Sequence, residues 1–162
     1  MNRNHVAVML CCAAVVYACA PRNRTSESAS QKKPASVERT TDSTRGLALT
    51  VSEGDDAMAF ALELRNNNDK LTEVRFANGR THDFIVLDEQ NREVWRWSEG
   101  RIFTQALQTK QLQKGEAVRY TAKWDGASPG RYRVVASLNS DKFNEPIERE
   151  FVVGATEAFA SR

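Results

Sequence analysis

The stretch 83–98 reads DFIVLDEQNREVWRWS, and it decides the fold class. Its first five residues form a nearly unbroken apolar run, which is typical of a strand at the centre of a sheet. Trp95 and Trp97 follow two positions apart, so they share one face if their segment is a strand. Between the two segments, Gln90-Asn91 supplies side chains that favour a tight turn. The stretch therefore predicts two strands joined by a short turn.

Outward from this stretch, apolar and polar residues alternate with a period of two, which predicts strands rather than helices. The alternating segments are 47–51, 58–64, 72–76, 118–124, 132–138 and 147–153. Turn-forming pairs such as Asn78-Gly79 and Lys114-Gly115 separate them. Regularly spaced strands of this kind predict an all-β domain over residues 46–154: an immunoglobulin-like antiparallel β-sandwich of about seven to nine strands. The segment 101–111 is the one place where a short helix is expected.

The N-terminus has the pattern of an export signal. Arg3 precedes a run of uncharged residues from Val6 to Ala18. A short basic region followed by an apolar run of about 7–15 residues is typical of a signal peptide. A membrane-spanning helix needs about 20 apolar residues, so this run is too short for a permanent anchor. We therefore expect residues 1–18 to be a signal peptide and the protein to be exported.

The sequence Val16-Tyr17-Ala18-Cys19 resembles a bacterial lipobox, the motif that ends a lipoprotein signal. The resemblance implies that Cys19 is lipidated and anchors the protein to the outer membrane or cell envelope. Val16 stands where Leu is usual, and Tyr17 is bulky for its position. Because residues 18–20 also fit a small-x-small cleavage site, the alternative is a soluble secreted or periplasmic protein.

Residues 19–45 are expected to be the lipidated cysteine and a flexible polar linker. They hold six basic and three acidic residues, and Val37 is their one large aliphatic residue. A segment of this composition cannot bury enough apolar surface to offset its ordering entropy. All three cysteines lie within residues 11–19, which excludes a disulfide framework from the domain. Residues 155–162 are expected to be a C-terminal tail.

Several short motifs occur in a fixed order along the domain. They are DFIVLD at 83–88, VWRWS at 94–98, FTQAL at 103–107, LQKGE at 112–116, WD at 124–125 and GRYRV at 130–134. As a set they resemble the BsuPI domain, a family of intracellular proteinase inhibitors. Lys114 stands where the family commonly has Pro, and Asn91 where it commonly has Gly. Asn also tolerates the left-handed backbone region that a turn Gly adopts.

The resemblance implies a proteinase inhibitor with a serine, subtilisin-like target, and we expect it to bind that target through a loop. Because this chain carries an export signal, an intracellular target is in doubt. The alternative function is a non-inhibitory binding or scaffolding module of the cell envelope, because one fold serves many functions. An inhibitor is expected to expose a rigid loop near Phe103 at one end of the sandwich. A scaffold is expected to show a flat apolar face or an unpaired sheet edge instead.

The candidate partner-binding residues lie around the second strand of the opening stretch and the irregular segment after it. They are Trp95, Arg96, Trp97, Arg101, Phe103, Thr104 and Gln105. Tryptophan and arginine are frequent at interface hot spots, and loops on a rigid sheet commonly carry recognition. Other interpretations remain open. In these interpretations both tryptophans pack in the core or one covers a sheet edge, and Arg96 pairs with an acid such as Glu93. Phe103, Ala106 and Leu107 then cap the sandwich.

The sequence lacks the residues that catalysis, a transition-metal site or a nucleic-acid-binding surface would require. His82-Asp83 resembles part of an acid–base pair, but no activated nucleophile accompanies it, and Ser98 has no evident base. One histidine after the signal, with no cysteine cluster, cannot form a transition-metal site. The net charge of residues 46–162 is −2, and no basic stripe occurs. We therefore expect no enzyme, no metal or other cofactor, and no nucleic-acid partner.

Overall fold

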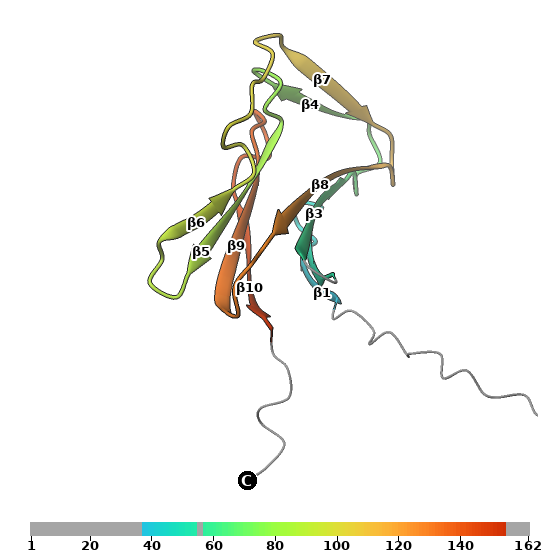
Figure 1. The fold of residues 1–162 in the computed structure, drawn as a ribbon. Helices are drawn as coiled ribbons and strands as arrows, with labels where there is room; N and C mark the ends of the chain where they lie inside the picture. The colour runs from blue at the N-terminus through green and yellow to red at the C-terminus, as the bar shows by residue number, and fades with distance from the viewer. Residues whose placement is uncertain (1–36, 55–56, 155–162) are drawn as a thin grey trace, which may run out of the picture. The chain divides into compact units, whose positions relative to one another are not determined.

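The computed structural model describes residues 37–54 and 57–154, and these residues form ten strands (Figure 1). The strands are β1 (Val37–Asp42), β2 (Leu47–Glu53), β3 (Ala57–Arg65), β4 (Thr72–Phe76), β5 (His82–Asp88), β6 (Glu93–Arg96), β7 (Gln108–Leu112), β8 (Ala117–Asp125), β9 (Gly130–Leu138) and β10 (Ile147–Val153). No helix of the described residues is long and apolar enough to cross a membrane. The predicted signal peptide, lipidated Cys19 and C-terminal tail lie outside the described residues.

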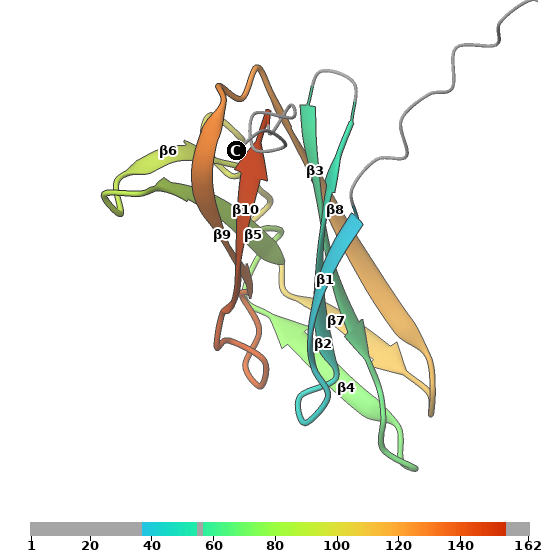
Figure 2. The same cartoon turned by 90° about the horizontal axis from the view of Figure 1, so that it is seen from below.

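The strands form two four-stranded antiparallel sheets that face each other (Figure 2). One sheet has the order β1-β2-β3-β8, and the other has the order β10-β9-β5-β6. Strands β4 and β7 pair separately as a third, two-stranded sheet. The predicted all-β sandwich is confirmed, with ten strands where seven to nine were expected.

The apolar side chains that alternate along the strands fill the space between the two large sheets. Phe60 on β3 is the centre of an aromatic cluster, because its ring lies 6.1 Å from Phe84, 5.9 Å from Trp95 and 5.6 Å from Phe151. These three partners come from strands β5, β6 and β10 of the opposite sheet. Aromatic pairs at such centroid distances add stabilisation beyond the area that they bury. The core therefore joins the sheets chiefly through aromatic side chains.

The first strand corrects the predicted linker boundary. Strand β1 occupies Val37–Asp42, inside the segment expected to be flexible, and it pairs in register with β2 from Val37↔Ser52 to Asp42↔Leu47. Arg149 on β10 also reaches it, because its Nη2 donates a 2.7 Å hydrogen bond to Glu38. Pairing with a neighbouring strand satisfies a polar backbone whatever its side chains are. Composition alone therefore placed the start of the domain too late.

The segment 101–111 contains no helix, which corrects the expectation of one. Residues from Gln108 onward form β7, which pairs with β4 in register from Phe76↔Gln108 to Thr72↔Leu112. Of the five residues in β7, Leu112 is the one that is buried. With a single apolar contact, the strand depends on its backbone pairing to β4.

The turn between β5 and β6 explains why an asparagine replaces the usual glycine. Asn91 has a φ of 59°, in the left-handed region that asparagine tolerates better than other residues with a side chain. Its Oδ1 also accepts a 2.6 Å hydrogen bond from Arg133 on β9. The asparagine therefore meets the backbone requirement and also ties the turn to the adjacent strand.

Asn66 holds the corner where β3 leads towards β4 and β7 leads towards β8. Its side chain is buried and donates hydrogen bonds to the carbonyls of Lys70 (2.8 Å) and Leu112 (2.9 Å). Its Oδ1 accepts from the Asn68 amide (3.0 Å) and the Thr72 hydroxyl (2.9 Å). The single side chain thereby satisfies polar groups from both sides of the corner, and it fixes the β4–β7 sheet to the sandwich.

We predict that Asn66→Ala lowers the free energy of unfolding by about 2–4 kcal/mol, because buried carbonyls lose their donors. Asn67→Ala is the matched control. Asn67 is exposed and makes one 3.3 Å hydrogen bond to Ser43, so its loss is expected to be about 0.5 kcal/mol or less. Urea unfolding measures both values. Equal losses in the two variants would show that the corner does not depend on Asn66.

Candidate functional site

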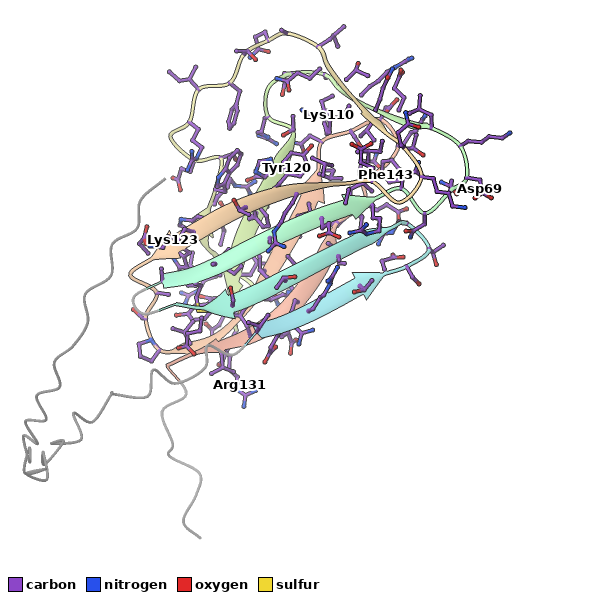
Figure 3. The ribbon with its side chains drawn as sticks, turned by 90° about the vertical axis from the view of Figure 1, so that its right-hand side faces the viewer. Asp69, Lys110, Tyr120, Lys123, Arg131 and Phe143 are labelled. Carbon is purple, nitrogen blue, oxygen red and sulfur yellow. The ribbon has the colours of Figure 1, made fainter. Side chains whose placement is uncertain are left out.

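The longest irregular segment inside the domain is the β6–β7 loop, Trp97–Leu107, which connects the β10-β9-β5-β6 sheet to β7 (Figure 1). In Figure 3 it arches above the sheet edge that β8 forms, where Lys123 is labelled. This loop contains five of the seven candidate residues, namely Trp97, Arg101, Phe103, Thr104 and Gln105. Its geometry therefore decides which of them can meet a partner.

The loop begins at a buried carboxylate. Asp83 on β5 is 2% exposed. Its Oδ2 accepts a 2.6 Å hydrogen bond from the Ser98 hydroxyl, and its Oδ1 accepts a 3.2 Å hydrogen bond from the Ser98 amide. Burying a carboxylate is unfavourable unless its oxygens are hydrogen-bonded. The residue that follows Trp97 is therefore held firmly to the neighbouring strand.

Arg96 completes this anchor on the outer side of the sheet. Its Nη1 lies 3.3 Å from Asp83 Oδ2, and its Nε donates a 2.8 Å hydrogen bond to Glu93. Hydrogen bonding to this guanidinium lowers the pKa of Glu93 and raises that of Arg96. The predicted pairing of Arg96 with Glu93 is thus present. The guanidinium is engaged by two carboxylates, which leaves it poorly placed as a partner contact.

Trp97 is the support on which the loop folds back. The Arg101 guanidinium carbon lies 4.7 Å from the centre of the indole ring, and Arg101 Nε donates a 2.7 Å hydrogen bond to the Trp97 carbonyl. The Phe103 ring lies 5.6 Å from the same indole. A guanidinium over an indole is attracted by the ring quadrupole. Two candidate residues on either side of Ile102 therefore point inward, towards Trp97.

A second anchor lies further along the loop. The Gly79 amide, in the turn after β4, donates a 2.8 Å hydrogen bond to the Thr104 carbonyl. A Cβ atom at Gly79 would lie 2.7 Å from Thr104 Oγ1, so only glycine permits this close approach. Thr104 and Gln105 are exposed on the loop surface. The loop is thus fixed at Ser98, at Trp97 and at Thr104.

Between these anchors, the loop exposes an aliphatic side chain that the sequence analysis did not single out. Ile102 is 100% exposed, and Leu107 at the end of the loop is 83% exposed. Phe103 is partly buried against Trp97, so the capping interpretation holds for Phe103 but not for Leu107. The sequence carries no signal for Ile102, because its exposure follows from the contacts that its neighbours Arg101 and Phe103 make with Trp97.

Trp95 belongs to the core rather than to the loop surface. Its ring lies 5.9 Å from Phe60 and 6.4 Å from Trp124, and it packs partly buried against the core cluster. The interpretation of Trp95 as a core residue therefore fits its position better than that of a partner contact. Trp97 is also partly buried and acts as the support described above.

His82 lies directly beneath that support. Its ring centre is 4.1 Å from that of Trp97 and 4.5 Å from that of Tyr120 on β8. Its Nδ1 shares a 3.1 Å hydrogen bond with the Thr81 hydroxyl, while its Nε2 is buried with no hydrogen-bond partner among the described residues. Burial lowers the pKa of His82 to about 4, and the nearby charge of Arg101 acts in the same direction. The imidazole is therefore neutral at physiological pH.

The site contains a serine, a histidine and an aspartate, but they are not arranged for catalysis. Ser98 donates to Asp83, whereas a nucleophilic serine donates to a histidine base. His82 lies on the opposite face of β5 from Asp83 and packs between two aromatic rings. Among the described residues, no group of three or more side chains is placed to bind a metal ion.

Comparison with known proteins identifies one family. The family described as "BsuPI: Intracellular proteinase inhibitor" matches residues 46–143, which is more than half of the chain. No curated protein sequence matches the chain. The family description is that of an inhibitor rather than an enzyme.

Several solved structures share a weak likeness with the chain. One is β-glucosidase 3B from Thermotoga neapolitana, with 12% identity and a TM-score of 0.34 over 74% of this chain. Another is the β-glucosidase from Kluyveromyces marxianus, with 17% identity and a TM-score of 0.35 over 74% of this chain. This chain spans 17% and 14% of the lengths of those two proteins. Likeness at this TM-score supports no conclusion about function.

We predict that the domain loses stability as the pH falls from about 6.5 to 4. The pKa of His82 is lower in the folded state than its ordinary value of 6.5, so folding favours the neutral ring. The resulting stabilisation is complete above pH 6.5 and decreases as the pH falls to and below the folded-state pKa, by a total of about 3 kcal/mol. Chemical unfolding at a series of pH values measures this loss.

His82→Phe is the matched variant, because it keeps an aromatic ring between Trp97 and Tyr120 and removes the titration. The carboxyl groups of Asp42, Asp88 and Glu93 also have lowered pKa values and lose stability in acid. The difference between the wild type and His82→Phe isolates the histidine. If both proteins follow the same pH profile, the buried imidazole makes no contribution.

Proposed function

The chain belongs to the BsuPI family of intracellular proteinase inhibitors, and from this premise we propose that it inhibits a serine, subtilisin-like protease through the β6–β7 loop. The family supports a protease as the partner in general. The proposal adds the class of protease and the segment that binds it. Inhibition would result from occupation of the active-site cleft, without chemistry by the inhibitor.

The observation that carries the proposal is an exposed loop apex on a rigid base. Asp83 fixes Ser98, Trp97 holds Arg101 and Phe103, and Gly79 holds Thr104. Between these contacts, residues 101–105 form no regular structure and leave Ile102 fully exposed. A segment that is already ordered loses little conformational freedom on binding, which favours affinity. An extended segment can also pair with a cleft as an additional strand.

We further propose that the protein is exported and anchored to the cell envelope by a lipid on Cys19. This differs from the location in the family description, and the N-terminal sequence supports it. The uncharged run 6–18 and the lipobox-like sequence ending at Cys19 precede a polar segment that separates the anchor from the domain. If residues 19–36 act as a flexible tether in this proposal, their length of about 18 residues would span roughly 20–25 Å on average. The protease would then be an envelope or extracellular enzyme.

One observation favours the alternative of a non-inhibitory binding module. Among the described strands, β8 pairs on one side only, with β3, and so forms an edge of its sheet (Figure 3). Its exposed side chains include the basic residues Arg119 and Lys123. An open edge can accept a strand from a partner, but charged side chains are also a common way to prevent such pairing. The rigid loop is the more specific feature.

We predict that the full chain reduces the activity of a subtilisin-like protease in a stoichiometric titration that follows hydrolysis of a small peptide substrate. The double variant Arg101→Ala/Phe103→Ala removes both contacts with Trp97. It is expected to inhibit at least tenfold more weakly and to be cleaved faster, because a mobile loop is a better substrate. Arg119→Ala, on the β8 edge, is the control and is expected to match the wild type.

Two results would contradict this proposal. Rapid cleavage of the wild-type loop, without inhibition, would show that the protein is a substrate. Failure to inhibit while the chain stays intact, together with binding of an envelope protein that Arg119→Ala weakens, would favour the binding module.

We predict that the protein incorporates a labelled fatty acid when it is produced in bacteria, and that Cys19→Ala abolishes the label because the acylated thiol is gone. Cys12→Ala is the matched control, because Cys12 lies within the predicted signal peptide, residues 1–18. Membrane fractionation gives a second measurement. An unlabelled, soluble wild-type protein that begins near Ala20 or later would support simple secretion instead.

A further inference from the structure

Three consecutive residues of the β6–β7 loop point in alternating directions. The Arg101 guanidinium lies 4.7 Å from the centre of the Trp97 ring, and the Phe103 ring lies 5.6 Å from it. Ile102 lies between them and is 100% exposed. Successive side chains of an extended backbone point to opposite sides. Because both neighbours are turned towards the same indole, Ile102 is directed away from the domain.

The Ile102 side chain does not contribute to the stability of the fold. A fully exposed aliphatic side chain contributes no burial, although the same side chain would gain about 1.5–3 kcal/mol if it were removed from water. It is the most exposed of the large apolar residues that the structure describes. Contacts on both sides of it hold the backbone in place, so its exposure does not come from a loose terminus or an unsupported turn. The arrangement presents one apolar side chain for burial elsewhere.

We propose that Ile102 is the specificity-determining residue, which enters the primary pocket of the target, and that the target is a protease whose primary pocket is apolar and uncharged. This inference rests on the proposed function, because it assumes that the loop occupies a protease cleft. It identifies the partner by the chemistry of its primary pocket. That pocket accepts a side chain branched at Cβ, as in proteases that cleave after aliphatic residues.

The neighbouring residues are poorly suited to that role. Arg101 could reach a pocket only by giving up its contact with the indole and its 2.7 Å hydrogen bond to the Trp97 carbonyl. Phe103 is partly buried against the same ring. A trypsin-type pocket carries a carboxylate at its base, which Ile102 would leave without a partner. Isoleucine also has few rotamers to lose on binding, which favours tight association.

The test measures inhibition constants of the full-length gene product as bacteria process it, kept in mild detergent, against four proteases of known pocket chemistry. These are subtilisin, an elastase, chymotrypsin and trypsin. The wild type is expected to inhibit subtilisin or elastase most tightly, and trypsin at least tenfold more weakly. Ile102→Ala is expected to weaken inhibition of the preferred enzyme roughly 30-fold to 100-fold, because about three methylene equivalents are no longer buried.

Two further variants test the assignment by gain of function. Ile102→Arg is expected to lose inhibition of the preferred enzyme and to gain at least tenfold against trypsin, because the cation now pairs with the pocket carboxylate. Ile102→Phe is expected to shift the preference towards chymotrypsin. Folding is not at risk, because Ile102 is fully exposed and surface substitutions commonly change stability by less than about 0.5 kcal/mol. Thermal unfolding checks this.

Leu107→Ala is the matched control, because Leu107 is an exposed aliphatic residue of the same loop beyond the Thr104 anchor. It is expected to stay within threefold of the wild type. If the wild type inhibits but all Ile102 variants behave like it, or if Leu107→Ala has the same effect as Ile102→Ala, the assignment of Ile102 is wrong and the proposed function stands. If the wild type inhibits none of the four enzymes, both are wrong.

Discussion

The β6–β7 loop depends on the buried carboxylate of Asp83. A carboxylate that is 2% exposed is tolerable only when its oxygens are hydrogen-bonded, and here the donors are the amide and hydroxyl of Ser98 together with Arg96. Those donors lie on β6 and immediately after it, so the requirement of one side chain on β5 sets where the loop leaves the sheet. A neutral side chain at this position would relax the requirement, and the loop would lose its first fixed point. The serine and aspartate that resemble catalytic residues are therefore structural.

Beyond that fixed point, a row of aromatic rings from both sheets supports the loop. The ring of Tyr120 on β8 packs against His82 of β5, which packs against Trp97, and the loop residues Arg101 and Phe103 contact Trp97. Dense packing transmits the rigidity of a core to whatever rests on it. Because the imidazole is packed between rings and has a pKa near 4, it acts as a neutral aromatic spacer in this row. The loop thus gains rigidity from the sandwich even though its own sequence is irregular.

Alternation predicted the sandwich well, because each central strand has an apolar face that the opposite sheet covers. It failed for β1, whose side chains are mostly exposed and whose pairing with β2 is a backbone property.

The site was predicted only in part. Arg96 pairs with Glu93 as composition indicated, and the loop lies where regular alternation stops. The sequence did not reveal that Arg101 and Phe103 turn towards Trp97, because these are tertiary contacts with a ring that itself packs on His82, 15 positions earlier in the chain. The exposure of Ile102 follows from those tertiary contacts, so it too could be recognised only in the structure.

The same contacts bear on why such a loop would inhibit rather than serve as a substrate. Cleavage on either side of Ile102 separates Arg101 from Phe103 along the chain, yet both side chains contact the single indole of Trp97. The new ends would remain attached to one rigid ring, with the downstream end also held by the Gly79–Thr104 hydrogen bond. Ends that stay close have a high effective concentration, so re-formation of the bond competes with release. A protease that cut this loop would therefore gain little separation of its products, and the complex would persist. Inhibition on this account is a property of Trp97 and its contacts as much as of the side chain that enters the pocket.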